Sequence, residues 1–369
     1  MKILIVKLSS LGDVVHTLPA LASLKKGHPE AEIDWLVEEE SKAILEGNPL
    51  ISKVVAIQKR GFRKAPGRTW DITRWLRARR YDMVLDFQGL MKSGIWLALS
   101  RGGRRIGFDR GRELSHLFLN EKLPPYNRDR HAVDRYLDLA RYAGGVGDVV
   151  KFPIFFNYRE QERVFKLLAE GTIGRGDRFV VVAPRARWKT KLWGTERFGE
   201  VARAIVESLG LKVVVVGGPN DRGYGEEIAS YGDGIINLAG LTTIKELAFL
   251  MKCARLVLSV DSGPLHIAAA LGVPVVAIFG PTAPWRTGPY GKNNIVITGG
   301  TECSPCFSRR CRKKDIACMS AITAGEVMDG VATLLRAGET LSSLDSGESL
   351  ASPAASEAEE DTVGCNHRD

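Results

Sequence analysis

Short apolar runs alternate with amphipathic segments along most of the chain. Runs rich in valine and isoleucine, separated by segments of helical periodicity such as 204–210 and 242–252, are typical of parallel sheets covered by helices on both faces. The pattern predicts an α/β protein with two doubly wound domains. The predicted strands are residues 2–7, 32–37, 53–57 and 82–87 in the first half and 179–183, 212–217, 256–260 and 275–279 in the second.

Within DSGPLHIAAALGVPVVAIFGPT at 261–282, the apolar run from Pro264 to Pro281 is nearly long enough to cross a bilayer. His266 and Pro274 interrupt it, so a buried helix followed by a strand is the better interpretation. Pro264 suits the first turn of that helix, and Gly272 suits its end. At the start of the chain, Lys7 ends an apolar run that is too short for a signal peptide, so we expect a cytoplasmic protein.

The domain boundary is expected at 150–178, where the sequence predicts a connecting strand, one helix and a glycine-rich break. A last helix is predicted to begin at Thr323. The segment after it lacks aromatic residues and is rich in serine, alanine, glycine and acids, so we expect it to be disordered. The predicted parts are a first domain at 1–155, a linker region at 156–178, a second domain at 179–322, a C-terminal helix at 323–339 and an acidic tail at 340–369.

The charge is unevenly distributed along the 369 residues, whose net charge is +9. Seven acids and one arginine give the tail −6, which leaves +15 on residues 1–339. Such a basic body suits a nucleic acid, a phosphorylated ligand or an acidic membrane surface, and charge alone does not choose among them. The six cysteines, without a secretory context, indicate reduced thiols rather than a disulfide framework.

Two turns from a strand into a helix are candidate sites. In the first, Ser9, Ser10 and Gly12 follow the strand at 2–7, and Asp13 opens the helix. A glycine turn there places backbone donors at the carboxyl end of the sheet, where α/β proteins bind ligands. Asp13 is then an N-cap or a general base, and the local sequence favours the cap. The turn lacks the three glycines of the dinucleotide fingerprint, which argues against a Rossmann dehydrogenase.

The second turn follows the strand at 256–260. The backbone N–H groups of Ser262, Gly263 and Leu265 would point at a ligand, with the positive end of the helix dipole behind them, as a diphosphate requires. His266 lies one turn inside the helix and is either a buried core histidine or a second ligand of the same anion. Asp261 beside it strengthens the ligand interpretation.

Several segments together resemble glycosyltransferase family nine, the bacterial lipopolysaccharide heptosyltransferases, and most of all those that add the first heptose to Kdo. The segments are KLSSLGDVVHTLPAL, DFQGLMKSG, HAVDRY, TKLW, SVDSGPLHIAAALGVPVVAIFGPT and GPYGKN, in that order from Met1 to about Ala337. The resemblance implies a GT-B fold, in which two Rossmann-like domains face an interdomain cleft. The first domain would bind the acceptor and the second would bind the nucleotide sugar.

The resemblance also implies roles for individual residues. Asp13 would be the general base, and Asp221 would bind the donor ribose on a looser match. The donor diphosphate would be bound by Thr190, Lys191, Asp261, Ser262, Gly263 and His266. The acceptor's carboxylates and phosphates would be bound by Arg60, Arg63, Lys64 and Gln88, although a basic run of this kind is otherwise a solvated face.

The activity implied by the resemblance is inverting transfer of L-glycero-D-manno-heptose from ADP-heptose to the Kdo of lipid A. No metal or cofactor is expected, nor a nucleic-acid partner. We expect a monomer that acts at the inner face of the cytoplasmic membrane as a peripheral protein. The alternatives are transfer of the second heptose, another family-nine enzyme with a different nucleotide sugar, and, from a different class, a basic nucleic-acid-binding protein with a four-cysteine module.

The cysteines Cys303, Cys306, Cys311 and Cys318 form a motif of their own. The first two have metal-ligand spacing, but a zinc ribbon would have a second close pair after a longer loop. Free thiols in a loop are the favoured interpretation, and a structural metal site is the alternative. Similar loops are more often associated with second-heptose enzymes, which leaves the first- or second-heptose assignment open.

Overall fold

The computed structural model describes residues 1–59, 65–109, 111–147 and 149–345. These divide into two compact units. Unit 1 comprises Met1–Phe155 with Trp285–Thr287, and unit 2 comprises Phe156–Pro284 with the chain from Gly288 onward.

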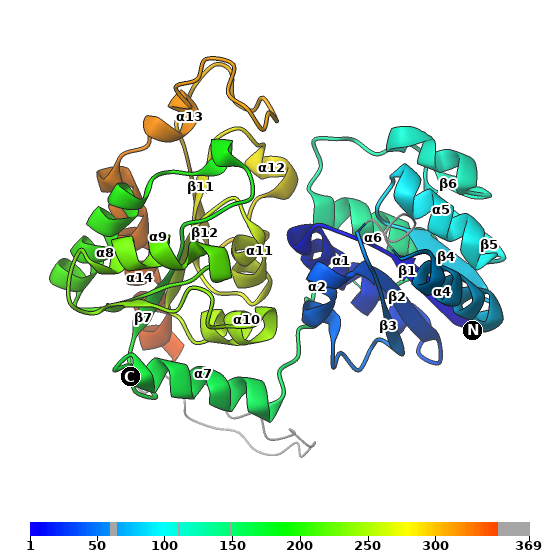
Figure 1. Cartoon of the computed structure of the whole chain (residues 1–369), viewed down its shortest axis with the longest axis horizontal. Coiled ribbons are helices and arrows are strands. Elements are labelled where there is room, and N and C mark those ends of the chain that lie inside the picture. The colour runs from blue at the N-terminus through cyan, green and yellow to red at the C-terminus, as the bar shows by residue number, and fades with distance from the viewer. Residues whose placement is uncertain (60–64, 110, 148, 346–369) are drawn as a thin grey trace. The chain divides into compact units, whose positions relative to one another are not determined.

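Unit 1 is built on a parallel six-stranded sheet in the order β3-β2-β1-β4-β5-β6 (Figure 1). Its strands are β1 (Lys2–Val6), β2 (Glu32–Glu38), β3 (Lys53–Ile57), β4 (Met83–Asp86), β5 (Arg104–Phe108) and β6 (Glu121–Leu123). Its α-helices are α1 (Leu11–Gly27), α2 (Glu39–Lys42), α4 (Pro66–Arg79), α5 (Met91–Ser100) and α6 (Ala132–Tyr142), and its 3₁₀ helices are η1 (Ala43–Leu45) and η2 (Arg112–Phe118). The chain order reverses direction between β1 and β4, and such a switch point opens a ligand crevice at the carboxyl ends of those strands.

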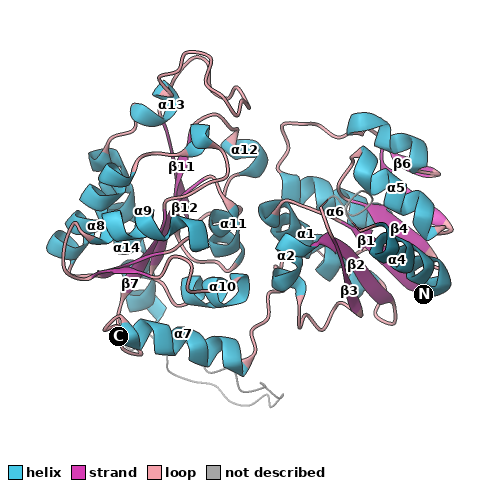
Figure 2. Ribbon diagram, viewed as in Figure 1, coloured by secondary structure: helices cyan, strands magenta, loops and turns pink. Residues whose placement is uncertain are grey.

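Helices cover both faces of this sheet (Figure 2). Leu4 and Val6 of β1 pack against Leu76 of α4 and Trp96 of α5. Side chains alternate along a strand, so Ile3 and Ile5, which are fully buried, face the opposite side. The strands are therefore apolar at nearly every position, as a sheet buried on both faces requires.

Unit 2 repeats this topology in a second parallel sheet, in the order β12-β11-β10-β7-β8-β9. Its strands are β7 (Phe179–Ala183), β8 (Lys212–Val215), β9 (Ile235–Asn237), β10 (Leu256–Val260), β11 (Val275–Phe279) and β12 (Asn294–Thr298). Its helices are α7 (Tyr158–Glu170), η3 (Lys189–Lys191), α8 (Thr195–Leu209), η4 (Pro219–Asp221), α9 (Arg222–Ala229), α10 (Ile244–Lys252), α11 (Gly263–Ala270), α12 (Pro284–Thr287, shared with unit 1), α13 (Ala317–Ser320) and α14 (Ala324–Asp345). The switch point here lies between β7 and β10, so the segments that follow these two strands line the crevice.

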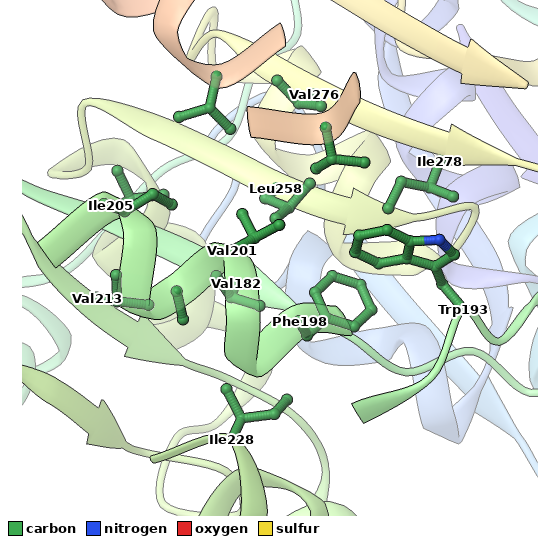
Figure 3. Close-up of a cluster of buried hydrophobic side chains, with 14 of the residues drawn as sticks. Val182, Trp193, Phe198, Val201, Ile205, Val213, Ile228, Leu258, Val276 and Ile278 are labelled. Atoms are coloured by element: carbon green, nitrogen blue, oxygen red, sulfur yellow. The ribbon is translucent and has the colours of Figure 1, made fainter. Parts of the chain in front are cut away.

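One face of the second sheet carries a large hydrophobic core, shown in Figure 3. Val182, Leu258 and Ile278 of the sheet pack there with Phe198 and Ile205 of α8. Helix α14 adds Val327 and Val331 to the same cluster. The last helix is therefore part of the core of unit 2.

All eight predicted strands are confirmed, and the stretch at 261–282 is the predicted helix and strand, α11 and β11. Within the described ranges, no helix is both long enough and apolar enough to span a membrane. The strands that the sequence analysis missed are β5, β6, β9 and β12, which lie toward the sheet edges. They carry charged or polar residues, as in RRIGF and EKL, so their apolar signal is weak.

Two expectations about the connections are wrong. Residues 151–157 form neither strand nor helix, so the connecting strand does not exist. The linker region 156–178 contains the one helix that the sequence predicts, α7, and this helix packs on α10 within unit 2. The last helix continues to Asp345, so the first residues of the expected disordered tail, 340–345, are helical. The rest of the predicted tail, 346–369, lies outside the described residues.

Candidate active site

The carboxyl ends of β1 and β4 present a set of polar residues at the switch point of unit 1. Residues 7–10 follow β1 directly, and helix α1 begins at Leu11. Asp86 ends β4, and Gln88 lies in the turn after it. Because parallel strands end at the same edge of a sheet, residues 80 positions apart in the chain come into contact here.

Asp13 is the third residue of α1, and Ser10, not Asp13, is the N-cap. The Oδ2 atom of Asp13 accepts hydrogen bonds from the backbone N–H of Ser10 at 3.0 Å and from its hydroxyl at 2.8 Å, as in a capping box. Its Oδ1 atom lies 3.8 Å from Nζ of Lys7. The Asp13 side chain is 35% exposed, so it caps the helix and still reaches solvent.

Lys7 is almost completely buried, with 2% of its surface exposed. Its Nζ donates to the Phe87 carbonyl at 3.0 Å and to the Tyr136 hydroxyl at 2.6 Å. Burial works to lower the pKa of Lys7, but the Tyr136 oxygen and the Asp13 carboxylate outweigh this effect and raise its pKa. A charged ammonium group therefore lies beneath the Asp13 carboxylate.

The turn after β4 is ordered by the buried carboxylate of Asp86. Its Oδ1 accepts from the backbone N–H groups of Gln88 and Gly89 at 2.9 and 3.0 Å. Burial raises the pKa of Asp86, although these hydrogen bonds oppose the rise. The Gln88 Oε1 accepts in turn from the backbone N–H groups of Leu8 and Ser9, both at 3.0 Å. The side-chain carbonyl of Gln88, which the sequence analysis assigned to the acceptor, therefore holds the segment that leads to Asp13.

In unit 2, three side chains converge on Asp261, the residue after β10. Its Oδ2 accepts from Nζ of Lys191 and from the hydroxyl of Thr282, both at 2.5 Å, and its Oδ1 lies 3.7 Å from Nε2 of His266. Burial works to raise the pKa of Asp261, but the hydrogen bond from His266 and the charge of Lys191 lower the pKa to about 2. The carboxylate is thus ionised and fixes the Lys191 ammonium and the His266 imidazole at one place.

Helix α11 starts beside this carboxylate. Ser262 is its N-cap, Pro264 lies in its first turn and Gly272, at φ +76°, follows its end, as predicted. The Ser262 hydroxyl lies 3.3 Å from that of Ser259. The start of this helix, together with Lys191 and His266, forms a positive site at the switch point of unit 2.

Lys191 is positioned by a 3₁₀ turn that packs on the cysteine loop, which we define as residues 301–318. The Thr190 hydroxyl donates to the Ser308 carbonyl at 2.9 Å. The Trp188 ring lies 4.8 Å from Nζ of Lys191 and 5.1 Å from the Arg309 guanidinium. The Thr190 hydroxyl therefore ties this turn to the loop.

Asp221 lies at the carboxyl end of β8, within η4. Its Oδ2 accepts from the backbone N–H of Gly218 at 2.9 Å, and its Oδ1 accepts from Nε of Arg185 at 3.3 Å. The Arg185 guanidinium also lies 3.6 Å from the centre of the Tyr224 ring. An acid, a cation and an aromatic ring thus flank the same edge of the sheet as Lys191.

The cysteine loop returns to the end of β11. The Ser304 hydroxyl donates to the Gly280 carbonyl at 2.5 Å, and the Phe307 N–H donates to the Pro281 carbonyl at 2.7 Å. Cys303 and Cys306 are exposed, and all four loop cysteines are free thiols. Burial and the three other sulfurs raise the pKa of Cys318. Across the ranges that the structure covers, no group of three or more His, Cys, Asp or Glu side chains is arranged to hold a metal ion.

The family model for glycosyltransferase family 9 (heptosyltransferase) matches residues 69–317. The chain belongs to glycosyltransferase family 9. Within the family it is similar to lipopolysaccharide heptosyltransferase 1 of Pseudomonas aeruginosa, with 31% identity over 84% of this chain and 87% of the relative. Lipopolysaccharide heptosyltransferase 1 of Escherichia coli is also 31% identical, over 82% of this chain and 95% of the relative.

Solved structures of the family share the fold. The E. coli heptosyltransferase WaaC with ADP is 27% identical, with a TM-score of 0.75 and coverage of 90% of this chain and all (100%) of the other. A family 9 glycosyltransferase from Veillonella parvula has a TM-score of 0.81 at 23% identity, covering 91% and 97% of the two chains. The predicted GT-B class, two Rossmann-like domains, is confirmed.

The structure of this family 9 chain brings the sequence-predicted residues into two groups, one in each unit. Asp13 and Gln88 lie together in unit 1, and Lys191, Asp261, Ser262, Gly263 and His266 lie together in unit 2. The predicted acceptor residues Arg60, Arg63 and Lys64 lie outside the described residues.

Sequence reasoning missed Lys7 and Thr282, which contact Asp13 and Asp261 directly, and Tyr136, which contacts Lys7. A lysine that ends an otherwise apolar strand is a signal that could have pointed to Lys7. Tyr136 and Thr282 gave no such signal, because their partners are distant in sequence.

Proposed function

We propose that this chain is a lipopolysaccharide heptosyltransferase, which transfers L-glycero-D-manno-heptose from ADP-heptose to the Kdo of the lipid A inner core. One observation carries the proposal: Lys191 and His266 are fixed on the buried Asp261 carboxylate at the start of α11. A site of this charge suits a diphosphate leaving group. The names of the relatives, and the ADP that accompanies WaaC in its solved structure, support the same donor.

In this proposal, the acceptor hydroxyl gives its proton to the Asp13 carboxylate as its oxygen bonds to the anomeric carbon of heptose. The bond from that carbon to the diphosphate breaks on the opposite side, so the anomeric configuration inverts. Negative charge then builds up on the leaving ADP. Lys191, His266 and the N–H groups of Ser262 and Gly263 would stabilise that charge, so the reaction would need no metal or cofactor.

The geometry refines two of the roles expected from the sequence. Asp261 is itself anionic and only 6% exposed, so it would position Lys191 and His266 rather than contact the diphosphate. Thr190 would act through the cysteine loop, because its hydroxyl already donates to Ser308. Asp221 beside Arg185 stays our proposal for the donor ribose. Unit 1 would thus serve the acceptor and unit 2 the donor.

The test is a panel of nucleotide sugars offered with two defined acceptors, Kdo-lipid A and the same lipid already carrying one heptose. We expect ADP-heptose alone to give a product, one heptose heavier by mass spectrometry, and only on the acceptor that lacks heptose. Transfer only to the heptose-bearing acceptor would make the chain a second-heptose enzyme. No product with ADP-heptose on either acceptor would overturn the proposal.

A further inference from the structure

The start of α1 differs from an ordinary capped helix because a buried cation, Lys7, lies beside the candidate base Asp13. Nζ of Lys7 lies 3.8 Å from Oδ1 of Asp13 and donates to the Tyr136 hydroxyl at 2.6 Å. The backbone of Lys7 is fixed as well, because its carbonyl accepts from Nε1 of Trp35 at 3.2 Å. An ammonium group in this position cannot leave for solvent, so its charge acts on Asp13 permanently.

We propose that Lys7 is a positioning residue of the reaction: held by Tyr136 and the Phe87 carbonyl, it keeps the Asp13 carboxylate ionised and oriented to accept the acceptor proton. The inference rests on the proposed function, since it takes Asp13 as the general base. Tyr136 holds Lys7 in this position through its hydroxyl. Burial raises the pKa of Tyr136, so its neutral hydroxyl holds the Lys7 ammonium without adding a competing negative charge.

Other charged and titratable groups lie on the elements that carry this pair or pack against those elements. They are Asp86 of β4, Arg135 of α6, His16 of α1, His131 before α6, Glu38 of β2 and Lys92 of α5. Lys92 is paired with Glu38 at 2.7 Å and with the Ser9 hydroxyl at 2.9 Å. Because its charge is already matched by Glu38, it does not substitute for Lys7 beside Asp13.

The role of Lys7 predicts a specific change in pH dependence. An opposite charge about 4 Å from a carboxylate typically shifts its titration by one to three pH units, and the partial exposure of Asp13 favours the low end. In Lys7→Met, the acid limb of the kcat/KM profile should therefore move up by about one pH unit. Activity at pH values on that limb should fall about tenfold and recover on the plateau above it. Lys7→Arg, which keeps the charge, should restore the position of the limb, and Tyr136→Phe should give a smaller shift in the same direction.

Two controls separate this role from simple support of the fold. Lys25→Met removes a lysine from the other end of α1 and should leave the profile unchanged. In an Asp13→Asn background, Lys7→Met should cause no further loss of turnover. A pH-independent loss in Lys7→Met, or an equal loss in both backgrounds, would overturn the proposal in favour of a structural role.

A measurement without turnover keeps this test apart from the proposed function. In protein labelled with ¹³C at the aspartate carboxyl carbons, the Asp13 signal is the one that disappears in Asp13→Asn. Its titration midpoint should rise by about one pH unit in Lys7→Met and stay in place in Lys7→Arg. An unmoved midpoint would refute the action of Lys7 on Asp13. A moved midpoint in a protein with no heptosyl transfer would refute the proposed function instead.

Discussion

Nζ of Lys191 lies 2.5 Å from Oδ2 of Asp261, a residue 70 positions further along the chain. The two residues follow β7 and β10, the neighbouring strands at which the order of the second sheet reverses. The order of the strands therefore brings the two residues together. Their ion pair places a fixed positive charge at the crevice that opens where the strand order reverses.

Replacing Lys191 should weaken donor binding. In Lys191→Met, we expect the Kd for ADP to rise about 10- to 100-fold, since a charge-assisted hydrogen bond contributes about 1.5–3 kcal/mol. Isothermal titration calorimetry would measure the change. Lys212→Met is the matched control. Lys212 is the first residue of β8, at the edge of the sheet away from the carboxyl ends, so this variant should bind ADP as the original chain does. Equal affinities in all three proteins would remove Lys191 from the donor site.

Asp13→Asn tests the base directly. The amide keeps a carbonyl oxygen for the Ser10 hydrogen bonds but cannot take up the acceptor proton, so turnover should fall about 100-fold or more while ADP affinity stays unchanged. Steady-state rates together with the same calorimetry give both quantities. If turnover remained near normal, Asp13 would serve α1 only as a capping residue.

The pH dependence of stability should reveal the Asp261 carboxylate. Its folded-state pKa of about 2 lies below the ordinary value of 3.8, so its contribution is complete above about pH 4 and is lost as the pH falls toward 2. The difference corresponds to about 2 kcal/mol. Thermal unfolding between pH 5 and pH 2 should therefore show a steeper loss in the original chain than in Asp261→Asn. Parallel curves would show that the group is not perturbed.

The cysteine loop should act through hydrogen bonds and not through a metal ion. Ser304, Phe307 and Ser308 make hydrogen bonds that tie it to the rest of unit 2, and the described thiols are not arranged as a metal site. We expect protein purified without added metal to contain far less than one ion per chain, and Cys303→Ser with Cys306→Ser to keep full activity. About one zinc per chain, lost together with activity in that double variant, would establish the structural site that we do not expect.

Binding to anionic vesicles should depend strongly on salt. The charge of +15 on residues 1–339 would draw the chain to acidic headgroups by about 1 kcal/mol for each basic residue near the surface. This attraction is screened over a Debye length, so co-sedimentation should drop sharply between low and physiological ionic strength. Neutral vesicles provide the control. Binding that ignores both salt and lipid charge would contradict an electrostatic mode of docking.

The predictable parts of the molecule are those whose signal is local. The apolar strands at 179–183 and 256–260 and the turn into α11 could be identified because their valines, Pro264 and Gly272 each carry a backbone or burial preference. The edge strand β6, with the sequence EKL, carries no such preference and exists because β5 lies beside it.

The candidate site divides in the same way. Asp13 and His266 lie in recognisable turns, whereas the contacts of Lys7 with Tyr136 and of Asp261 with Thr282 join residues 129 and 21 positions apart. The motif pointed to Asp261 as a direct ligand, but it did not reveal that Lys191 and His266 enclose this carboxylate, on which our proposal of a positioning role rests. Contacts of this kind, between residues far apart in the sequence, become visible only once the sheet has brought their strands together.

The position of α14 in the core of unit 2 affects the order of folding during synthesis. The sheet of unit 1 is complete once Leu123 has been made, so that unit can fold while the rest of the chain is still being translated. The core of unit 2 waits for Val327 and Val331 of α14. Until α14 has been synthesised, the apolar face formed by β7, β8, β10 and β11 lacks this covering helix, so the nascent chain is exposed to aggregation and to chaperones during that interval.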